Sequence, residues 1–500
     1  MKNTEDIHQL IRALSKAEKR HFKMSAARYS KSQNNYLLLF DAIDQQESYD
    51  ESRLKQKFSR YAFGKSIHKT KYLLYELILR SLRPLSNSKS VRDQLEGKMQ
   101  SVDFLFSKGL YEQAEILLRK VKKLALHYQL LPLQLRVLDW EKRLIHHSRE
   151  ATTLTRVEQL LDEYDRISSQ VRIEMRYRGM AERCFQLEKL LPPGQYTLAL
   201  GQVLDSQPIE DHRNAPSFLA QLYRRELLAR RAFDAGQLRV AIRHQQAIYQ
   251  NWQNASWLTE VFPQEFQRTL QSYLRYRLDA LEGSSHKFVE VLDFWREYMP
   301  HRTSEEAEKL DLHLVVFDFI HNLNRGNLQI CATRLLVIRD TIERYEALLD
   351  LSTKIQLYYH IGIYYFFVRE FDEALEWVLR TQEKANRQLH PRSQRFCELI
   401  ELMTRYELGE YEYLASAVRK MYRNLRQKPQ PIRIESLILR SVRQLLNVSD
   451  SSQVKPIFER LYDSLQQIED PTYQRNSLQT NVLYRWINEY LPQKSNEHFY

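Results

Sequence analysis

The chain has 500 residues, more than one compact hydrophobic core usually holds, so it folds either as several domains or as an elongated repeat array. Its 11 glycines and 14 prolines make up 5% of the residues, against a usual combined share of roughly 12%, which indicates a helical protein. The net charge of +12 favours an acidic partner, and three widely separated cysteines exclude a disulfide framework and a zinc ribbon.

The first residues, MKNTEDIHQLIRAL, contain no apolar segment of the kind that follows the charged start of a signal peptide. The most apolar stretch, IGIYYFFV at 361–368, is much shorter than the roughly 20 residues that a bilayer requires. We therefore expect no membrane insertion. Together with the cysteine pattern, this predicts a cytoplasmic protein in a reducing compartment.

Residues 1–84 predict a small basic helical bundle. A capping box at Ser15 to Glu18 separates a short first helix from a second. Apolar runs then predict a third helix over 36–46, a fourth over 50–58 and a fifth over 66–83. Pro84 and the polar residues after it mark a boundary, and residues 85–97 form a linker or the first helix of the next part.

The stretch from residue 53 to residue 83 contains nine Lys or Arg residues and one acid, so it carries +8 of the net charge. Helices three to five resemble a helix-turn-helix arrangement in length, which would place basic side chains near phosphates and base edges. A solvated helix face and a site for an acidic protein segment are the alternatives. The candidate residues of this basic patch are Arg53, Lys55, Lys57, Arg60, Lys65, His68, Lys69 and Lys71.

From residue 98 onward, short polar breaks recur between amphipathic runs. Six breaks contain a glycine, at 109, 194, 236, 283, 326 and 409, and equivalent breaks lie near 151, 369 and 450. Successive breaks are 40 to 47 residues apart, a period of about 43, which fits one antiparallel helical hairpin. The predicted fold is all-α, with an α-solenoid of about eight or nine hairpins over 98–492 and a polar tail over 493–500.

Residues around the breaks resemble the tetratricopeptide (TPR) repeat, in which Gly-x-aromatic-x-x-Ala joins two helices. The matching groups include Gly109, Tyr111 and Ala114, and the best unit is YYHIGIYYFFVREFDEALEWVLR from residue 358. The period differs from the 34 residues of that family, which suggests longer hairpins or a TPR-like relative. The opening of the chain also resembles uncharacterised helical-repeat proteins of bacteria of the Bacteroidota type, a likeness that implies no function.

The TPR resemblance implies a concave groove, lined by the first helix of each hairpin, that holds peptides. Aromatic and arginine side chains are typical binding hot spots, although ordinary helix packing explains the same pattern. The candidate residues of this groove are Tyr223, Arg230, Phe233, Tyr273, Arg277, Tyr359, Ile363, Phe366, Phe396, Met403 and Tyr406.

Motifs for catalysis are absent from the sequence. Gly64, Lys65 and Ser66 match only the end of a phosphate-binding loop, since Ser59 stands where its first glycine belongs and no strand is predicted before it. The adjacent His146 and His147 would point about 100° apart on a helix and could not share a metal. We predict no catalytic residues, no cofactor and no metal, and hence no enzyme.

Two functions follow as hypotheses. The first is a non-enzymatic scaffold that binds a peptide or protein segment in the concave groove of a TPR-like array. The second is a nucleic-acid-binding regulator that uses the basic helices of residues 50–83, with the array as a sensor or partner-binding module. The sequence identifies neither the partner nor the oligomeric state.

Overall fold

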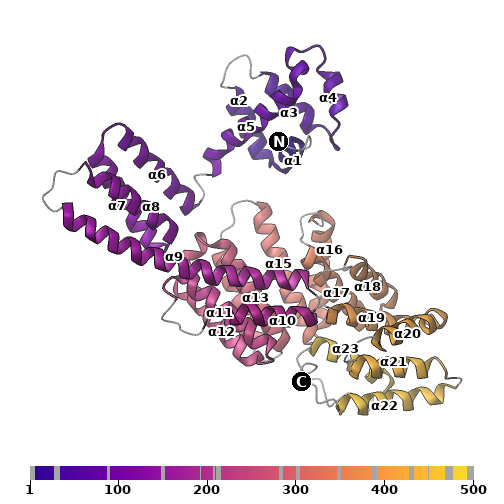
Figure 1. The fold of residues 1–500 in the computed structure, drawn as a ribbon. Coiled ribbons are helices and arrows are strands. Elements are labelled where there is room, and N and C mark those ends of the chain that lie inside the picture. Colours follow the sequence, from indigo (N-terminus) through magenta and orange to yellow (C-terminus); the bar gives the residue numbers. More distant parts are fainter. Residues whose placement is uncertain are drawn as a thin grey trace. The chain divides into compact units, whose positions relative to one another are not determined.

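The computed structural model of the chain is helical, with 23 α-helices and no strand among the residues that it describes (Figure 1). The described residues are 6–27, 34–86, 90–147, 153–191, 193–206, 209, 215–280, 285–299, 304–345, 351–384, 391–426, 433–448, 450–467 and 477–491. The predicted all-α class is confirmed. The predicted polar tail, 493–500, lies outside the described residues.

The chain divides into two compact units, Met1–Leu160 and Leu161–Tyr500. The division falls inside one long helix, α9 (Thr153–Leu190), rather than at residue 84, where the sequence analysis placed the first boundary. Helices α6 to α8 are therefore grouped with the N-terminal helices and not with the later hairpins. The two units are described separately below.

The first unit begins with the five helices that the sequence predicts. The capping box is present: the Ser15 backbone N–H donates to Oε2 of Glu18 over 2.8 Å, and the Glu18 N–H donates to Oγ of Ser15 over 3.3 Å. Fourteen buried apolar residues between Ile7 and Ile78 form one core cluster within these helices. The elements of this unit are α1 (Asp6–Ala13), α2 (Lys16–Ala27), α3 (Asn34–Asp44), α4 (Glu51–Lys57), the 3-10 helix η2 (Ala62–Ser66), α5 (Ile67–Ser86), α6 (Val91–Ser107), α7 (Tyr111–His127) and α8 (Leu131–Ile145).

Helix α9 corrects the sequence analysis, which expected separate helices between the breaks at 151 and 194. It runs without interruption for 38 residues, and Gly194 lies in the first turn of the next helix. The physical reason is composition: the segment contains no proline and a single glycine, Gly179, so nothing ends the helix.

The second unit continues in consecutive helices that contact one another in chain order. These are α10 (Pro193–Asp205), α11 (Phe218–Asp234), α12 (Leu238–Asn254), the 3-10 helix η4 (Ser256–Glu260), α13 (Pro263–Ala280), α14 (Ser285–Tyr298), α15 (Ser304–Asn324), α16 (Leu328–Tyr345), α17 (Leu351–Phe367), α18 (Phe371–Lys384), α19 (Pro391–Glu407), α20 (Tyr411–Arg426), α21 (Arg433–Leu445), the 3-10 helix η6 (Ser451–Gln453), α22 (Val454–Gln466) and α23 (Ser477–Tyr490).

The turns at five of the predicted breaks, at 109, 236, 326, 369 and 409, share one hydrogen-bond pattern. At Gly409, with φ 76°, the Gly409 N–H donates to the carbonyl of Tyr406 and the Glu410 N–H donates to the carbonyl of Arg405. This is the Schellman ending of a helix, which needs a left-handed residue. The predicted equivalence of the break near 369 is confirmed, because Arg369 has φ 67° and the same pair of bonds surrounds it. The break at Gly283 lies outside the described residues.

Alternate helices also touch in the second unit. Each first helix of a hairpin contacts the next one along the series α13, α15, α17, α19 and α21, in addition to its own hairpin partner. Helices α17 and α18 pack closely at Gly362, where a Cβ would lie 3.1 Å from Cγ2 of Val378. A larger residue at this position would require Val378 to shift. One apolar core cluster runs from α15 to the C-terminal helix, α23.

Candidate functional site

The predicted groove residues fall into two groups in the structure. Eight of the eleven side chains are at most 9% exposed and pack between helices: Tyr223, Tyr273, Tyr359, Ile363, Phe366, Phe396, Met403 and Tyr406. The six of them on α17 and α19 belong to the core cluster of the second unit. Their side chains stabilise the fold, and Ile363 and Met403, with no exposed surface, cannot contact a peptide in this conformation.

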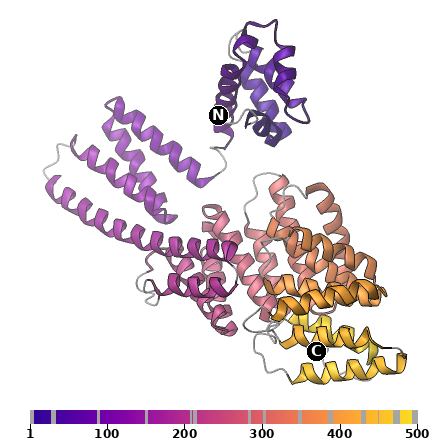
Figure 2. The same cartoon turned by 45° about the vertical axis from the view of Figure 1, so that its right-hand side comes forward.

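Part of this face is covered by the C-terminal helix of the chain. Helix α23 contacts α15 and α17, and its Trp486 ring lies 6.1 Å from the ring of Tyr406 on α19. Figures 1 and 2 both draw α23, in yellow, beside the orange helices of residues 391–445. Sequence reasoning missed this contact because Trp486 and Tyr406 are far apart in the chain and α23 follows the last predicted break, near residue 450.

A single carboxylate holds two aromatic side chains of α23. Trp486 donates its indole N–H to Oε1 of Glu407 over 2.7 Å, and the Tyr490 hydroxyl donates to the same oxygen over 2.8 Å. Burial and the neighbouring Glu407 carboxylate raise the pKa of Tyr490, so the phenol keeps its proton and remains a donor. This arrangement recognises an indole and a phenol that are four residues apart on one helix.

Charged side chains surround this contact. Arg369 pairs with Glu489 over 2.9 Å, and the Arg485 guanidinium lies 5.0 Å from the centre of the Phe367 ring. An open pocket remains where α17, α19 and α23 meet. Its lining consists of Phe366, Phe367, Arg369, Phe371, Glu407, Arg485, Trp486 and Glu489.

The second group of predicted groove residues is accessible. Phe233 is 37% exposed, and Arg230 and Arg277 are partly exposed. Arg230 donates from Nε to the Tyr196 hydroxyl over 2.9 Å, and Arg277 donates to the Tyr273 hydroxyl over 3.2 Å. These bonds hold both guanidinium groups in place at the surface.

Two tyrosines that the sequence analysis did not select complete this region. The Tyr276 ring meets the Phe233 ring edge to face, 5.0 Å between centres. Burial, and then the charges of Asp234 and other neighbours including Tyr276, raise the pKa of Tyr196, which places Tyr196 near the same residues. We call the set of Tyr196, Arg230, Phe233 and Tyr276 the Arg–Tyr face. Tyr196 lies on α10, just after the predicted break at Gly194, whereas the groove candidates were taken from the first helix of each hairpin, before the break.

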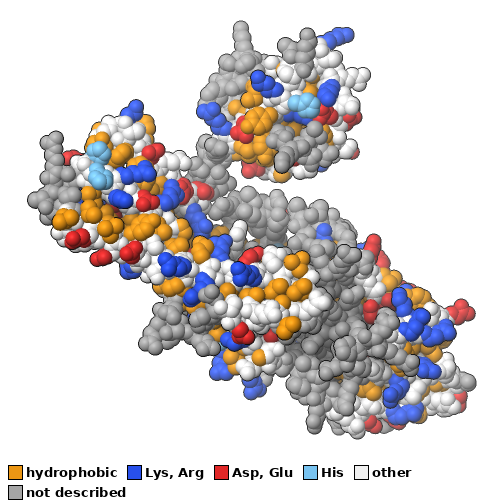
Figure 3. Space-filling model, viewed as in Figure 1, with side chains coloured by type: hydrophobic (Ala, Val, Ile, Leu, Met, Phe, Trp, Pro, Cys, Tyr) orange, Lys and Arg blue, Asp and Glu red, His pale blue; other side chains and the backbone are white. Residues whose placement is uncertain are grey.

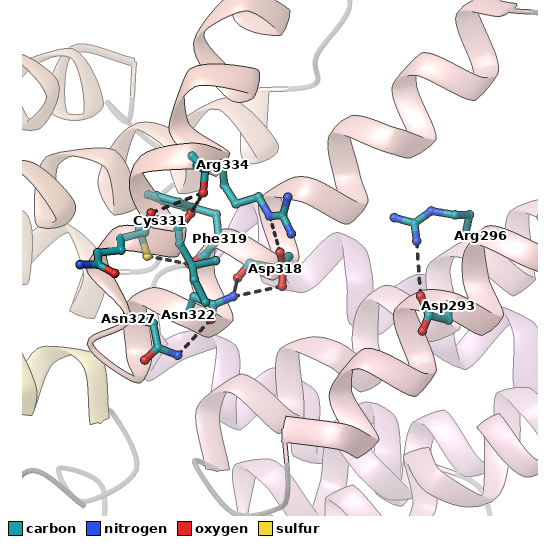
Figure 4. Close-up of polar contacts among 11 residues, drawn as sticks. Asp293, Arg296, Asp318, Phe319, Asn322, Asn327, Cys331 and Arg334 are labelled. Atoms are coloured by element: carbon teal, nitrogen blue, oxygen red, sulfur yellow. Dashed lines mark hydrogen bonds and ion pairs between the residues drawn. The ribbon is translucent and has the colours of Figure 1, made fainter.

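Polar residues at the turn between α15 and α16 are occupied by structural contacts (Figure 4). Asp318 accepts from Nε of Arg334 over 2.6 Å, and Asn322 donates to both the side chain and the carbonyl of Asp318. Cys331, on α16, is fully buried, with its sulfur 3.7 Å from the carbonyl oxygen of Phe319. These contacts stabilise the turn.

The basic patch of the first unit is partly neutralised. Glu51, just outside the stretch whose charge was counted, pairs with Lys55 at 2.8 Å, His68 at 3.1 Å and Lys71 at 2.9 Å. Hydrogen bonds from Lys55 and Lys71 lower the pKa of Glu51 to about 2, against the opposing effect of burial. Lys71 is 2% exposed and also donates to the Tyr49 hydroxyl over 2.7 Å, so it stabilises the junction of α4 and α5.

The remaining patch residues are accessible. Arg53, Lys57, Arg60 and Lys69 are exposed, whereas the side chain of Lys65 lies outside the described part. A further exposed basic group was missed by the sequence analysis: Figure 3 shows Lys and Arg side chains gathered over the C-terminal helices. Its exposed members on α20 and α21 are Arg419, Lys420, Arg423, Arg440 and Arg443.

Other sequence features have structural explanations. Gly64, Lys65 and Ser66 lie in the 3-10 helix η2, which follows a helix and not a strand, so the phosphate-loop geometry is missing there. The His147 ring stacks on Tyr111, 4.0 Å between centres. No group of three potential metal-ligating side chains was found among the described residues, and no described helix has the length and apolarity needed to cross a bilayer.

Comparison with models of known protein families, with curated proteins and with solved structures yields no match to this chain. The function is therefore argued from the geometry of the molecule alone.

Proposed function

We propose that this protein is a non-enzymatic scaffold, a TPR-like α-solenoid whose first helices bind a segment of another protein. The Arg–Tyr face is the binding surface. The observation that carries the proposal is the combination of a positioned arginine, Arg230, with exposed and partly exposed aromatic rings on α10, α11 and α13.

The chemistry of the Arg–Tyr face suits an extended segment with acidic and apolar residues. A guanidinium group binds a carboxylate with two parallel hydrogen bonds, and the rings of Phe233 and Tyr276 supply contact area at low cost in side-chain entropy. Arg230 is already oriented by the Tyr196 hydroxyl, so less conformational freedom is lost when a ligand binds. Binding energy would come from this preorganisation.

The test is selection of a displayed library of random peptides on the full-length protein, followed by affinity measurement with the peptides recovered. We expect peptides that combine acidic and aromatic or aliphatic residues. Arg230→Ala and Tyr276→Ala should each weaken binding at least about tenfold, a loss of roughly 1.4 kcal/mol. Arg296→Ala is the matched control, because Arg296 is an exposed arginine on α14 that pairs with Asp293. Equal affinities for all three variants would refute the assignment.

A second candidate is contact with nucleic acid through the basic patch. Its support is the exposure of Arg53, Lys57, Arg60 and Lys69 beside the exposed rings of Tyr61 and Tyr72. Lys57→Glu combined with Lys69→Glu should abolish a mobility shift of mixed DNA or RNA at low salt, and the affinity of the unmodified protein should fall steeply with salt. A protein that shifts neither nucleic acid at low ionic strength does not have this function.

A further inference from the structure

Helix α23 contacts helices far from it in the chain. Besides the preceding helix α22, it packs on α15 and α17, and it bonds to Glu407 at the end of α19. Its buried apolar residues are Val482, Leu483, Trp486 and Ile487, each at most 2% exposed. Spacings of three, four and five residues between them define one apolar face of an amphipathic helix. Such a helix lying across first helices is the geometry of helix-in-groove recognition.

The contact depends on particular side chains and not only on apolar area. Glu407 accepts from both Trp486 and Tyr490, and the Tyr490 ring stacks on Phe458 with 4.0 Å between centres. A carboxylate that receives two side-chain hydrogen bonds from one helix selects the identity and spacing of those residues. Replacement of either donor would leave the Glu407 oxygen with one bond fewer.

Helix α23 also carries an unsatisfied buried amide. Asn488 is 9% exposed, and neither Nδ2 nor Oδ1 of its amide has a hydrogen-bond partner among the described residues. A buried amide without partners weakens the packing of the helix that carries it. The ion pair of Arg369 with Glu489 adds little, because the two side chains are 60% and 40% exposed. Helix α23 is thus a specific occupant of this face but not the tightest that the face can hold.

We propose that the face formed by α15, α17 and α19 is a binding site for an amphipathic helix, and that α23 is its intramolecular occupant. A partner helix displaces α23 when it presents an indole and a phenol four residues apart, with an apolar residue in place of Asn488. This inference rests on the proposed scaffold function but concerns a different part of the molecule from the Arg–Tyr face.

The partner's remaining chemistry follows from the flanking contacts of α23. A cationic residue directly before the indole faces Phe367, and an acidic residue three positions after it faces Arg369. The sequence of the partner helix is therefore expected to contain Arg-Trp-apolar-apolar-acidic-Tyr, in which the second apolar residue stands in place of the asparagine of this chain.

The probe is a synthetic peptide of residues 477–491 with Asn488→Leu, labelled with a fluorophore at its amino end. Its affinity for three full-length proteins is compared by fluorescence anisotropy. A chain with Asn488→Leu, whose own helix is held more tightly, should bind the probe most weakly. The unmodified chain should be intermediate, and a chain with Trp486→Ala should bind at least about tenfold more tightly than the Asn488→Leu chain.

Hydrogen exchange of residues 477–490 shows whether α23 has left the face. Exchange of these amides should accelerate when the probe binds the unmodified chain. If the Trp486→Ala chain loses its helical structure, Tyr490→Phe replaces it, since this change removes one hydrogen bond and keeps the ring. Equal probe affinity for all chains, or no binding to a chain whose α23 amides already exchange freely, would overturn the proposal.

A charge exchange separates recognition from general stability. Arg369→Glu removes the same contact from the probe and from the chain's own α23, so a probe with Glu489→Arg should bind that variant a few-fold more tightly than the unmodified probe does. The Arg230→Ala chain should bind the probe that carries Asn488→Leu with unchanged affinity. The helix-binding proposal and the Arg–Tyr face can therefore fail independently, because the Arg–Tyr face is tested with the peptides selected from the library. If the probe with Glu489→Arg binds the Arg369→Glu chain no better than the unexchanged probe does, Arg369 does not take part in recognition.

Discussion

Trp486 donates its indole N–H to Glu407 across 2.7 Å, although 79 positions separate the two residues in the chain. The bond joins the last helix of the chain to the end of α19, and the Tyr490 hydroxyl shares the same acceptor oxygen. Because hydrogen bonds to a charged acceptor contribute more than neutral ones, this carboxylate is a main polar attachment of α23.

Glu407→Gln should lower the stability of the second unit by about 1–2 kcal/mol, because a neutral amide is a weaker acceptor for the two donors. Urea unfolding followed by tryptophan fluorescence measures the change. Glu383→Gln, at an exposed position on α18, should change stability by less than about 0.5 kcal/mol. Equal effects of the two substitutions would show that Glu407 does not anchor α23.

Replacement of Glu51 should destabilise the first unit more than replacement of Lys71, its buried partner. Glu51→Gln leaves Lys71, at 2% exposure, without its carboxylate, which should cost about 3 kcal/mol. Lys71→Met removes the buried charge itself, and Glu51 keeps Lys55 and His68, so a smaller loss is expected. Chemical denaturation of both variants decides the order, and a larger loss for Lys71→Met would contradict this account.

The second unit should lose stability when the pH falls from about 6.5 to about 4. His321 is 8% exposed and stacked on Phe288, and burial lowers its pKa to about 4. The unfolded chain binds a proton near pH 6.5 while the folded chain does not, so protonation favours unfolding throughout this window. The expected contribution reaches roughly 3 kcal/mol at its lower end. This contribution of His321 to the pH dependence of stability should be absent from the His321→Gln variant when the free energy of unfolding is measured at several pH values.

Two glycine substitutions should have opposite signs. Gly409→Ala places a side chain at φ 76° and should cost about 1–2 kcal/mol, whereas Gly179→Ala lies inside α9 and should stabilise by about 0.5–1 kcal/mol. A Cβ at either position meets no atom within 4 Å, so steric contact does not confuse the comparison. Thermal unfolding of both variants measures the difference, and a shared sign would contradict the helix and turn assignments.

The three cysteines should be unreactive in the folded protein. Cys184, Cys331 and Cys397 are unpaired and fully buried, and burial raises the pKa of Cys331 and Cys397 to about 12 each. The thiolate, which is the reactive form, is therefore scarce at neutral pH. A thiol reagent should label none of the three under native conditions and all three in denaturant. Rapid labelling of the native protein would show that one of these positions opens.

The local features of the fold were predictable because they depend on neighbouring residues. The capping box at Ser15, the five N-terminal helices and the left-handed turn at Gly409 each follow from residues a few positions apart. Even the turn at Arg369, which lacks a glycine, was located from the spacing of its neighbours. The uninterrupted α9 was missed because regular spacing was given more weight than the absence of helix-breaking residues.

The candidate sites are formed by contacts between residues that are far apart in the chain, and local sequence patterns do not predict such contacts. The sequence alone determined that the chain is helical, where most of its helices end and which residues are basic, since propensity, capping and charge act within a few residues. Tertiary structure decided that Lys71 is buried against Glu51, that Met403 belongs to the core and that α23 covers α17. Burial and ion pairing are set by which helices meet in space, and those encounters involve residues tens of positions apart.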